Sequence, residues 1–196
     1  HHINAKKIAQ VGARTMLEQA LMSGFFHGDP HPGNLMVLAG NKVCFLDFGI
    51  VGRLSAGMRR KLLLIFKNLV TKDFERAIDH TIDVAEISDN ANVAGFRSKL
   101  NQLFGDWYGA TLGQMSLSKA FFNGIASGVH YGVYFPTDLV LFAKMLVTSE
   151  SVGLLLDARF DLSKETRPFI ERVAQTELSQ FTTIRETVQN SLEYSD

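Results

Sequence analysis

The sequence predicts a mainly α-helical fold that contains one short β-hairpin. Apolar residues recur at helical spacing over residues 3–23 and again over most of the chain after Ser55. Between these parts, two short apolar runs, 35–38 and 43–46, flank the turn-forming residues 39–42. We therefore expect an α+β domain in which helices dominate and strands are few and short.

The first helix is predicted by one apolar face. Its members are Ile8, Val11, Ala13, Met16, Leu17, Ala20 and Leu21. Gly24 stands where a helix C-terminal cap is expected. Residues 27–34 contain two prolines and two glycines, so we expect a loop without regular structure there.

From Ser55 onward we expect helices to the end of the chain. The predicted helical segments are 55–70, 73–87, 93–104, 117–127, 136–156 and 165–192. Ser55, Asp73 and Ser163 are the predicted N-terminal caps, because short polar side chains accept hydrogen bonds from the first helical amides. The last helix carries a narrow apolar stripe that suits packing either on the bundle or on a partner. This stripe consists of Phe169, Ile170, Val173, Leu178, Phe181, Ile184 and Val188.

Aromatic residues are dense in two places, at Phe121 and Phe122 and over residues 131–135. Aromatic side chains usually fill protein cores, and we expect that here. A surface that contacts lipid or a partner is the alternative interpretation.

Composition places limits on the function. The 196 residues carry twenty Lys and Arg against twenty Asp and Glu, a formal net charge of zero. A general nucleic-acid binder needs clustered basic residues to neutralise phosphates, so this class is excluded. The single cysteine, Cys44, excludes an intramolecular disulfide and a multi-cysteine metal site. No apolar run approaches the ~20 residues that cross a bilayer, so we expect no transmembrane segment in this chain.

Chemistry-bearing residues gather between His27 and Gly49. Asp29 and Asn34 lie five residues apart in the proline-stiffened loop, and Asp47 ends the second predicted strand. Because a hairpin brings its two ends together, Asn34 and Asp47 should lie close to each other. Their amide and carboxylate oxygens suit Mg²⁺, which binds one or two carboxylates together with substrate phosphates. Asp29 is then left to face a hydroxyl group or a water molecule.

The spacing follows the pattern of kinase catalytic residues. In kinases a loop Asp orients the nucleophile, an Asn five residues later holds one Mg²⁺, and the Asp of a DFG sequence holds the other. Here Asp29, Asn34 and Asp47 occupy these places, and Phe48 and Gly49 complete the DFG. A second interpretation of Asp29 is that its carboxylate caps its own loop by accepting backbone amides.

The stretches HGDPHPGNLMV and VCFLDFGIVGRL resemble the UbiB family of atypical, protein-kinase-like proteins linked to ubiquinone biosynthesis. The resemblance is tightest over residues 24–54 and extends more loosely through the helices, including residues 147–160. Aminoglycoside and choline phosphotransferases are the nearest alternative, because their loop also begins His-Gly-Asp. Pro30 after Asp29 and the complete DFG favour UbiB.

The resemblance implies the large (C-terminal) lobe of a protein-kinase-like fold, with a helical bundle around the catalytic loop and the DFG hairpin. It implies Mg²⁺ and ATP as cofactors. We expect one domain over residues 1–196, with the loop, hairpin and DFG at 24–54, the bundle at 55–162 and a C-terminal helix at 163–196. We expect the N-terminal lobe to lie outside this piece.

The resemblance also implies roles for single residues. Asp29 is the catalytic-loop aspartate, and Asn34 and Asp47 are the metal ligands. The implied cofactor-binding residues are Asn34, Asp47, Phe48 and Gly49. The loop is shaped by His27, His31 and Gly33, and His27 packs behind it near Phe48.

Two departures from the kinase pattern bear on function. Only 26 residues precede His27, so the nucleotide-covering loop, the strand lysine and the Lys-x-Gly-Gln motif of the family have no counterpart. We therefore expect this piece alone to be inactive and to bind ATP weakly or not at all.

No Ala-Pro-Glu follows the DFG, and residues 50–54 lead almost at once into a helix. The missing activation segment favours a small-molecule or lipid substrate over a peptide.

The resulting expectation is an Mg-ATP-dependent atypical kinase or ATPase that supports ubiquinone (coenzyme Q) biosynthesis. Its expected partners are ATP, a lipid or isoprenoid-quinone precursor, other ubiquinone-biosynthesis proteins and the missing N-terminal lobe, but no nucleic acid. Two alternatives stay open: a non-catalytic, nucleotide-sensing scaffold of a biosynthetic complex, and an aminoglycoside- or choline-type phosphotransferase. The resemblance implies a cytoplasmic protein peripheral to the inner membrane in a bacterium, or one on the matrix side in a mitochondrion.

Overall fold

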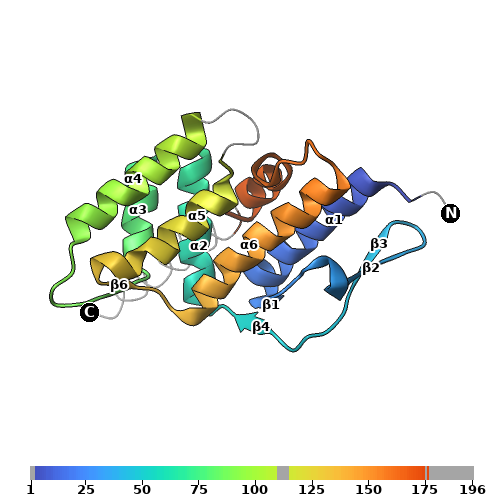
Figure 1. The fold of residues 1–196 in the computed structure, drawn as a ribbon, viewed down its shortest axis with the longest axis horizontal. Coiled ribbons are helices and arrows are strands. Elements are labelled where there is room, and N and C mark those ends of the chain that lie inside the picture. Colours follow the sequence, from blue (N-terminus) through green and yellow to red (C-terminus); the bar gives the residue numbers. More distant parts are fainter. Residues whose placement is uncertain (1–2, 110–114, 175, 177–196) are drawn as a thin grey trace, which may run out of the picture.

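The computed structural model describes residues 3–109, 115–174 and 176, and this part of the chain is mostly helical (Figure 1). Its principal helices are α1 (Ala5–Glu18), α2 (Ala56–Val70), α3 (Phe74–Ile82), α4 (Val93–Gly109), α5 (Leu117–Ser127) and α6 (Thr137–Leu156). Residues 162–174 are also helical. Shorter helical turns are η1 (Gln19–Ser23), η2 (Pro32–Asn34) and η3 (Gly128–Tyr131). The strands are β1 (Phe25–His27), β2 (Leu35–Leu38), β3 (Lys42–Phe45), β4 (Val51–Arg53), β5 (Glu86–Ile87) and β6 (Val133–Tyr134).

The predicted first helix is confirmed. The side chain of Asn4 accepts a hydrogen bond from the Lys7 amide at 3.0 Å and caps α1. The helix continues into the π-helical turn η1 and ends at Gly24, which has the left-handed conformation of a cap (φ 74°). A Cβ atom at Gly24 would lie 2.6 Å from the Leu54 carbonyl oxygen. Both the conformation and the close approach therefore require glycine.

The predicted hairpin is confirmed as the antiparallel pair β2–β3, with Leu35 opposite Phe45. Asn41 and Gly40 make its turn with positive φ angles of 58° and 79°. The expectation that residues 27–34 lack regular structure is wrong at both ends of the loop. His27 is the last residue of β1, and η2 forms a 3₁₀ turn directly before the hairpin.

A second antiparallel pair, β1–β4, was not predicted. Phe26 lies opposite Gly52, and His27 lies opposite Val51. The Phe26 ring covers Gly52 so closely that a side chain at Gly52 would collide with it. Residues 51–53 are thus strand rather than the direct entry into a helix. Strands of three residues show no alternation of their own, so only the distant partner defines them.

The predicted caps of the second and third helices are confirmed. The Ser55 hydroxyl accepts a hydrogen bond from the Met58 amide at 3.1 Å, and the Asp73 carboxylate accepts one from the Arg76 amide at 3.3 Å. These side chains replace the partners that the first turn of a helix lacks. α2 and α3 consequently begin where the sequence indicates.

The expectation of helices alone after Ser55 is wrong in one place. β5 and β6 pair antiparallel, with Glu86 opposite Tyr134 and Ile87 opposite Val133. Each strand has only two residues, which is too short to be recognised by alternation of polar and apolar residues. α4 also extends beyond its predicted end at residue 104, to Gly109.

The cap of the last helix needs correction. Asp161, not Ser163, is the capping residue, and the helix begins at residue 162. The Asp161 carboxylate accepts hydrogen bonds from the Lys164 amide at 3.2 Å and from the Ser163 hydroxyl at 2.6 Å. Ser163 is thus a helical residue whose hydroxyl supports the real cap.

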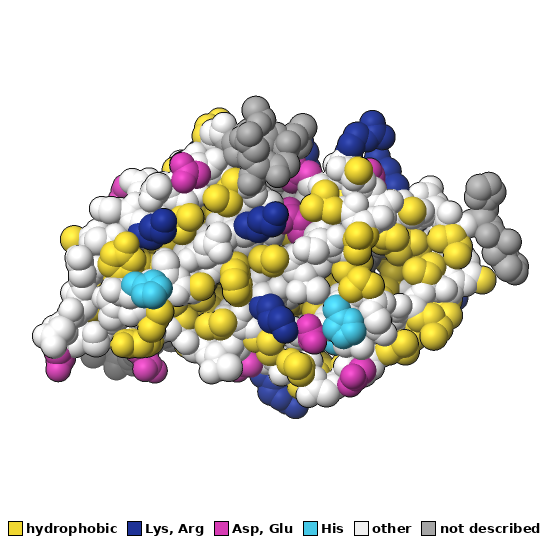
Figure 2. Space-filling view, in the orientation of Figure 1, with side chains coloured by type: hydrophobic (Ala, Val, Ile, Leu, Met, Phe, Trp, Pro, Cys, Tyr) yellow, Lys and Arg dark blue, Asp and Glu magenta, His cyan; other side chains and the backbone are white. Residues whose placement is uncertain are grey.

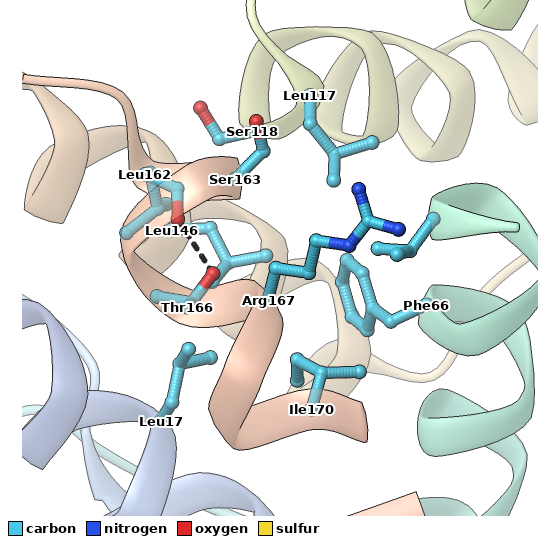
Figure 3. Close-up of a pocket in the computed structure, with 11 residues that line it drawn as sticks. Leu17, Phe66, Leu117, Ser118, Leu146, Leu162, Ser163, Thr166, Arg167 and Ile170 are labelled. Carbon is cyan, nitrogen blue, oxygen red and sulfur yellow. Dashed lines mark hydrogen bonds between the residues drawn. The ribbon is translucent and has the colours of Figure 1, made fainter. Parts of the chain in front are cut away.

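Part of the apolar stripe of the last helix lies in the core. Its buried members are Phe169, Ile170 and Val173. The members outside the described residues are Leu178, Phe181, Ile184 and Val188. Where this helix meets the bundle, an apolar cavity of about 30 Å³ remains, lined among others by Leu17, Phe66, Leu146 and Ile170 (Figure 3). This volume suits a water molecule rather than a larger ligand, so the cavity is a packing gap.

α6 runs through the middle of the molecule and packs against α1 and α5 (Figure 1). With 20 residues and a mean hydropathy of 1.8, it is long and apolar enough to cross a membrane. The expectation that no apolar run approaches that length is therefore wrong. Here α6 is a core helix, since Phe142 and Met145 are fully buried and the Phe142 ring meets the Phe26 ring edge-on at 5.9 Å. The apolar character of α6 thus serves the core on its buried side, although Leu154 and Leu155 remain exposed.

The dense aromatic stretches belong mainly to the core. The buried Phe121 ring packs on Phe66 at 5.1 Å between ring centroids. Tyr131 and Phe135 both pack on the buried Phe96, at 5.8 and 5.9 Å. These contacts favour the core interpretation over a lipid-contacting surface.

Charged side chains of both signs are spread among hydrophobic ones on the face shown in Figure 2. Lys and Arg side chains stand apart from one another on this face, in keeping with the net charge of zero.

Candidate active site

The candidate catalytic loop runs from β1 to the hairpin and is supported from behind by His27. This imidazole is fully buried, and its Nδ1 atom accepts a hydrogen bond from the Asp29 amide at 3.1 Å. Its Nε2 atom lies 2.9 Å from the Leu46 carbonyl oxygen. The His27 ring also lies 5.1 Å from the Phe48 ring of the DFG. His27 therefore connects the loop, the end of β3 and the DFG.

Asn34 joins the loop to the hairpin. Its side-chain Nδ2 donates a hydrogen bond to the Asp29 backbone carbonyl oxygen at 3.1 Å. Its backbone carbonyl oxygen accepts a hydrogen bond from the Leu46 amide at 2.8 Å. The two ends of the hairpin thus meet, as its geometry predicts. Asp47 follows directly on the residue that is bonded to Asn34.

Asp47 has an unusual backbone conformation. Its φ of 50° lies in the left-handed region, which costs energy for a residue with a side chain. Its Oδ1 atom accepts a hydrogen bond from the Gly49 amide at 3.1 Å, forming a tight turn over Phe48. Asp47, Phe48 and Gly49 are all exposed in this structure. Such strain is common at functional sites, where the surrounding structure holds it in place.

Asp29 presents its carboxylate on the surface of the loop. Its Oδ1 atom forms an ion pair with Nζ of Lys144, on α6, at 3.2 Å. In the described part of the chain the carboxylate thus pairs with a distant lysine, not with an amide of its own loop. The backbone of Asp29 is fixed separately, because its carbonyl oxygen also accepts the His31 amide at 2.9 Å.

His31 and Gly33 shape the turn between Asp29 and Asn34. The Nδ1 atom of the exposed His31 accepts a hydrogen bond from the Gly33 amide at 3.1 Å and caps η2. A Cβ atom at Gly33 would lie 2.9 Å from the His31 ring. The small residue and the imidazole together define the turn.

Within the described residues, Lys144 is a functional candidate that sequence patterns did not reveal. α6 contains three charged residues, Asp138, Lys144 and Glu150, in an otherwise apolar sequence. Each of them has a specific partner: Asp138 accepts the Arg53 amide, Lys144 pairs with Asp29, and Glu150 accepts the Ser118 hydroxyl. The signal available in the sequence was a single lysine in an otherwise apolar helical segment.

The described residues contain no group of three or more His, Cys, Asp or Glu side chains placed to hold a metal ion. Mg²⁺ bound with a nucleotide needs fewer protein ligands, because water and phosphate oxygens complete its coordination. Asn34 and Asp47 offer one amide and one carboxylate oxygen at the joined ends of the hairpin. This donor set fits an Mg²⁺ that arrives with phosphate.

Two models of known protein domains match separate parts of the chain. A model of the ABC1 atypical kinase-like domain matches residues 1–81, which hold the loop, the hairpin and the DFG. A model of the UbiB helical domain matches residues 100–161, which hold α5 and α6. The chain belongs to the UbiB/ABC1 family. This membership supports a kinase-like function, and the ion pair between Asp29 and Lys144 joins the two matched parts.

Individual UbiB/ABC1 relatives agree with these matches. The chain is 26% identical over 178 residues to an uncharacterised protein of Synechocystis, covering 91% of this chain and 26% of the relative. It is 25% identical over 171 residues to the chloroplastic protein ACTIVITY OF BC1 COMPLEX KINASE 7 of Arabidopsis thaliana, covering 87% of this chain and 25% of the relative. The chain thus spans about a quarter of the length of these relatives.

Proposed function

We propose that this chain forms the large lobe of an atypical kinase or ATPase of the UbiB type that uses Mg²⁺ and ATP. The observation that carries the proposal is the connected arrangement of Asp29, Asn34 and Asp47. Asn34 is bonded to Asp29 through its side chain and to the residue before Asp47 through its backbone. Asp29, Asn34 and Asp47, the three residues of the kinase pattern, thus lie near the open end of the hairpin, opposite its turn.

Each residue has a role in this proposal. Asp29 orients the acceptor hydroxyl or a water molecule and accepts its proton, for which its partly exposed carboxylate and fixed backbone are suited. Asn34 and Asp47 would hold Mg²⁺, which supplies positive charge to phosphate oxygens when it is bound. Positioning and charge neutralisation then provide most of the rate enhancement.

The proposed acceptor is a small molecule or a lipid rather than a peptide. Protein kinases carry a long segment between DFG and Ala-Pro-Glu, which contains their phosphorylation site. Here β4 begins at Val51, two residues after Gly49, and pairs with β1 before α2 starts at Ala56. This geometry leaves little chain to hold a peptide.

The biological setting is proposed from the UbiB resemblance. It comprises ubiquinone biosynthesis, a lipid or isoprenoid-quinone precursor as substrate, partner proteins of that pathway and a location at the surface of a membrane. The UbiB/ABC1 match favours this setting over an aminoglycoside- or choline-type phosphotransferase.

The test measures ATP hydrolysis and Mg-dependent nucleotide binding by the full-length protein, with and without lipid vesicles. Asp47→Asn should abolish Mg-dependent binding, whereas Asp29→Asn should retain binding and lose turnover. The matched control is Asp106→Asn, a change in an exposed aspartate on α4. Unchanged low turnover together with intact binding in all variants would instead support a nucleotide-sensing scaffold.

A further inference from the structure

One face of α6 is pressed against the candidate catalytic loop. Asp138 and Lys144, two of its residues, bind the Arg53 amide at 3.0 Å and the Asp29 carboxylate at 3.2 Å. Leu141, three residues before Lys144 and so its neighbour on the helix surface, also faces the loop, at Gly28. The helical domain therefore contributes directly to the wall of the site.

The loop approaches α6 closely because Gly28 has no side chain. A Cβ atom at Gly28 would lie 2.7 Å from the nearer methyl group of Leu141. Gly28 is buried, whereas the neighbouring Asp29 is partly exposed. This contact fixes the distance between the loop and α6, and hence the position of Lys144 beside Asp29.

Lys144 is a cation from another part of the chain that faces the candidate catalytic loop. Within residues 24–54 the basic residues are Lys42 and Arg53. Lys42 lies at the far, turn end of the hairpin, and the Arg53 guanidinium stacks over the Phe25 ring at 5.1 Å. The Lys144 side chain is 48% exposed and the Asp29 side chain is 28% exposed. A ligand from solvent can therefore reach the ammonium without breaking into the core.

We propose that Lys144, supplied by the helical domain, contacts the phosphoryl group that is transferred at this site. The inference rests on the proposed function. During transfer, negative charge is spread over the oxygens of the phosphoryl group, and a lysine acts on it as a point charge. An ammonium group has three N–H donors, so Lys144 can keep its bond to Asp29 while it donates to a phosphate oxygen. This places the proton-accepting carboxylate next to the transferred group.

The test compares two ligands of the full-length protein, Mg-ADP and Mg-ADP with aluminium fluoride, which mimics a phosphoryl group during transfer. The variants are Lys144→Met, Lys144→Arg and, as a matched control, Lys119→Met, which changes an exposed lysine on α5. Wild type should bind the aluminium fluoride complex more tightly than Mg-ADP alone. The Lys144→Met variant should bind Mg-ADP as tightly as wild type. Its gain in affinity on adding aluminium fluoride should be smaller than that of wild type by about tenfold or more. Lys144→Arg should retain most of that affinity, because it keeps the charge.

The outcomes separate this inference from the proposed function. If wild type does not bind Mg-ADP, or if Asp47→Asn binds it as tightly as wild type, the proposed function is overturned, and this inference falls with it. If Asp47→Asn abolishes binding but Lys144→Met keeps the full added affinity, only the role of Lys144 is overturned. A wild type that gains nothing from aluminium fluoride overturns it as well. Should Lys144→Met unfold, as judged by circular dichroism, Lys144→Gln replaces it in the same comparison.

Discussion

The amide of Asp29 donates a hydrogen bond to Nδ1 of the fully buried His27, at 3.1 Å. Nδ1 is therefore unprotonated, and the proton is on Nε2, which donates to the Leu46 carbonyl oxygen at 2.9 Å. One neutral imidazole thus ties the candidate catalytic loop to the end of the hairpin. This explains why a histidine stands two residues before the aspartate.

Replacing His27 by alanine should destabilise the protein strongly. The change removes two hydrogen bonds, each worth about 0.5–1.5 kcal/mol, and leaves a cavity in place of a fully buried imidazole. We expect the free energy of unfolding, measured by urea denaturation, to fall by about 3 kcal/mol. The control His130→Ala, at an exposed histidine of η3, should leave it nearly unchanged. Equal stability of the two variants would contradict the supporting role of His27.

Asp161 should stabilise the last helix in a pH-dependent way. Burial raises the pKa of this carboxyl, but hydrogen bonds from Ser163 and Lys164 and the Lys164 charge outweigh that effect and lower it below the ordinary value of 3.8. Because the pKa is lower in the folded state, the stabilisation is present above the ordinary value and is lost as the pH falls through the folded pKa.

The measurement is urea denaturation of Asp161→Ala and wild type at neutral and at strongly acidic pH. The variant should be less stable by about 1 kcal/mol at neutral pH, and the difference should shrink in acid. Ser163→Ala should cost less than Asp161→Ala. The reverse order would restore Ser163 as the cap.

Gly28→Ala should lower turnover by pushing the loop away from α6. The added methyl group would lie 2.7–2.9 Å from three carbon atoms of the Leu141 side chain, so the loop and α6 must move apart or Leu141 must shift. We expect about a tenfold loss of ATP turnover in the full-length protein, or about 1.4 kcal/mol. The double variant Gly28→Ala, Leu141→Ala removes the collision and should regain activity. Failure of this rescue would show that Gly28 acts through something other than its contact with α6.

Two glycines should respond to alanine in opposite directions. Gly24→Ala adds a side chain where φ is positive and the Leu54 carbonyl oxygen is 2.6 Å from the new atom, so stability should fall by more than about 1 kcal/mol. Gly105 lies within α4 with open space around it. Gly105→Ala should therefore raise stability by about 0.5–1 kcal/mol. Thermal unfolding of both variants checks the pair, and shifts in the same direction would contradict the account of Gly24.

Local sequence was enough to predict the features whose partners lie nearby. The caps at Ser55 and Asp73 bond to amides three residues ahead, and the β2–β3 hairpin closes through its own turn. The pattern of Asp29, Asn34 and Asp47 could be recognised for the same reason, since a loop and a hairpin connect them directly. In these cases the chain between the partners is short and sets their geometry.

The tertiary structure alone decided the contacts between distant residues. β1 and β4, like β5 and β6, are too short to show a period and take their hydrogen bonds from strands far along the chain. The pairing of Asp29 with Lys144 spans 115 residues and depends on how α6 packs against the loop at Gly28. The apolar composition of α6 indicates that it packs in the interior, but the packing of the whole bundle determines which of its residues reaches the site.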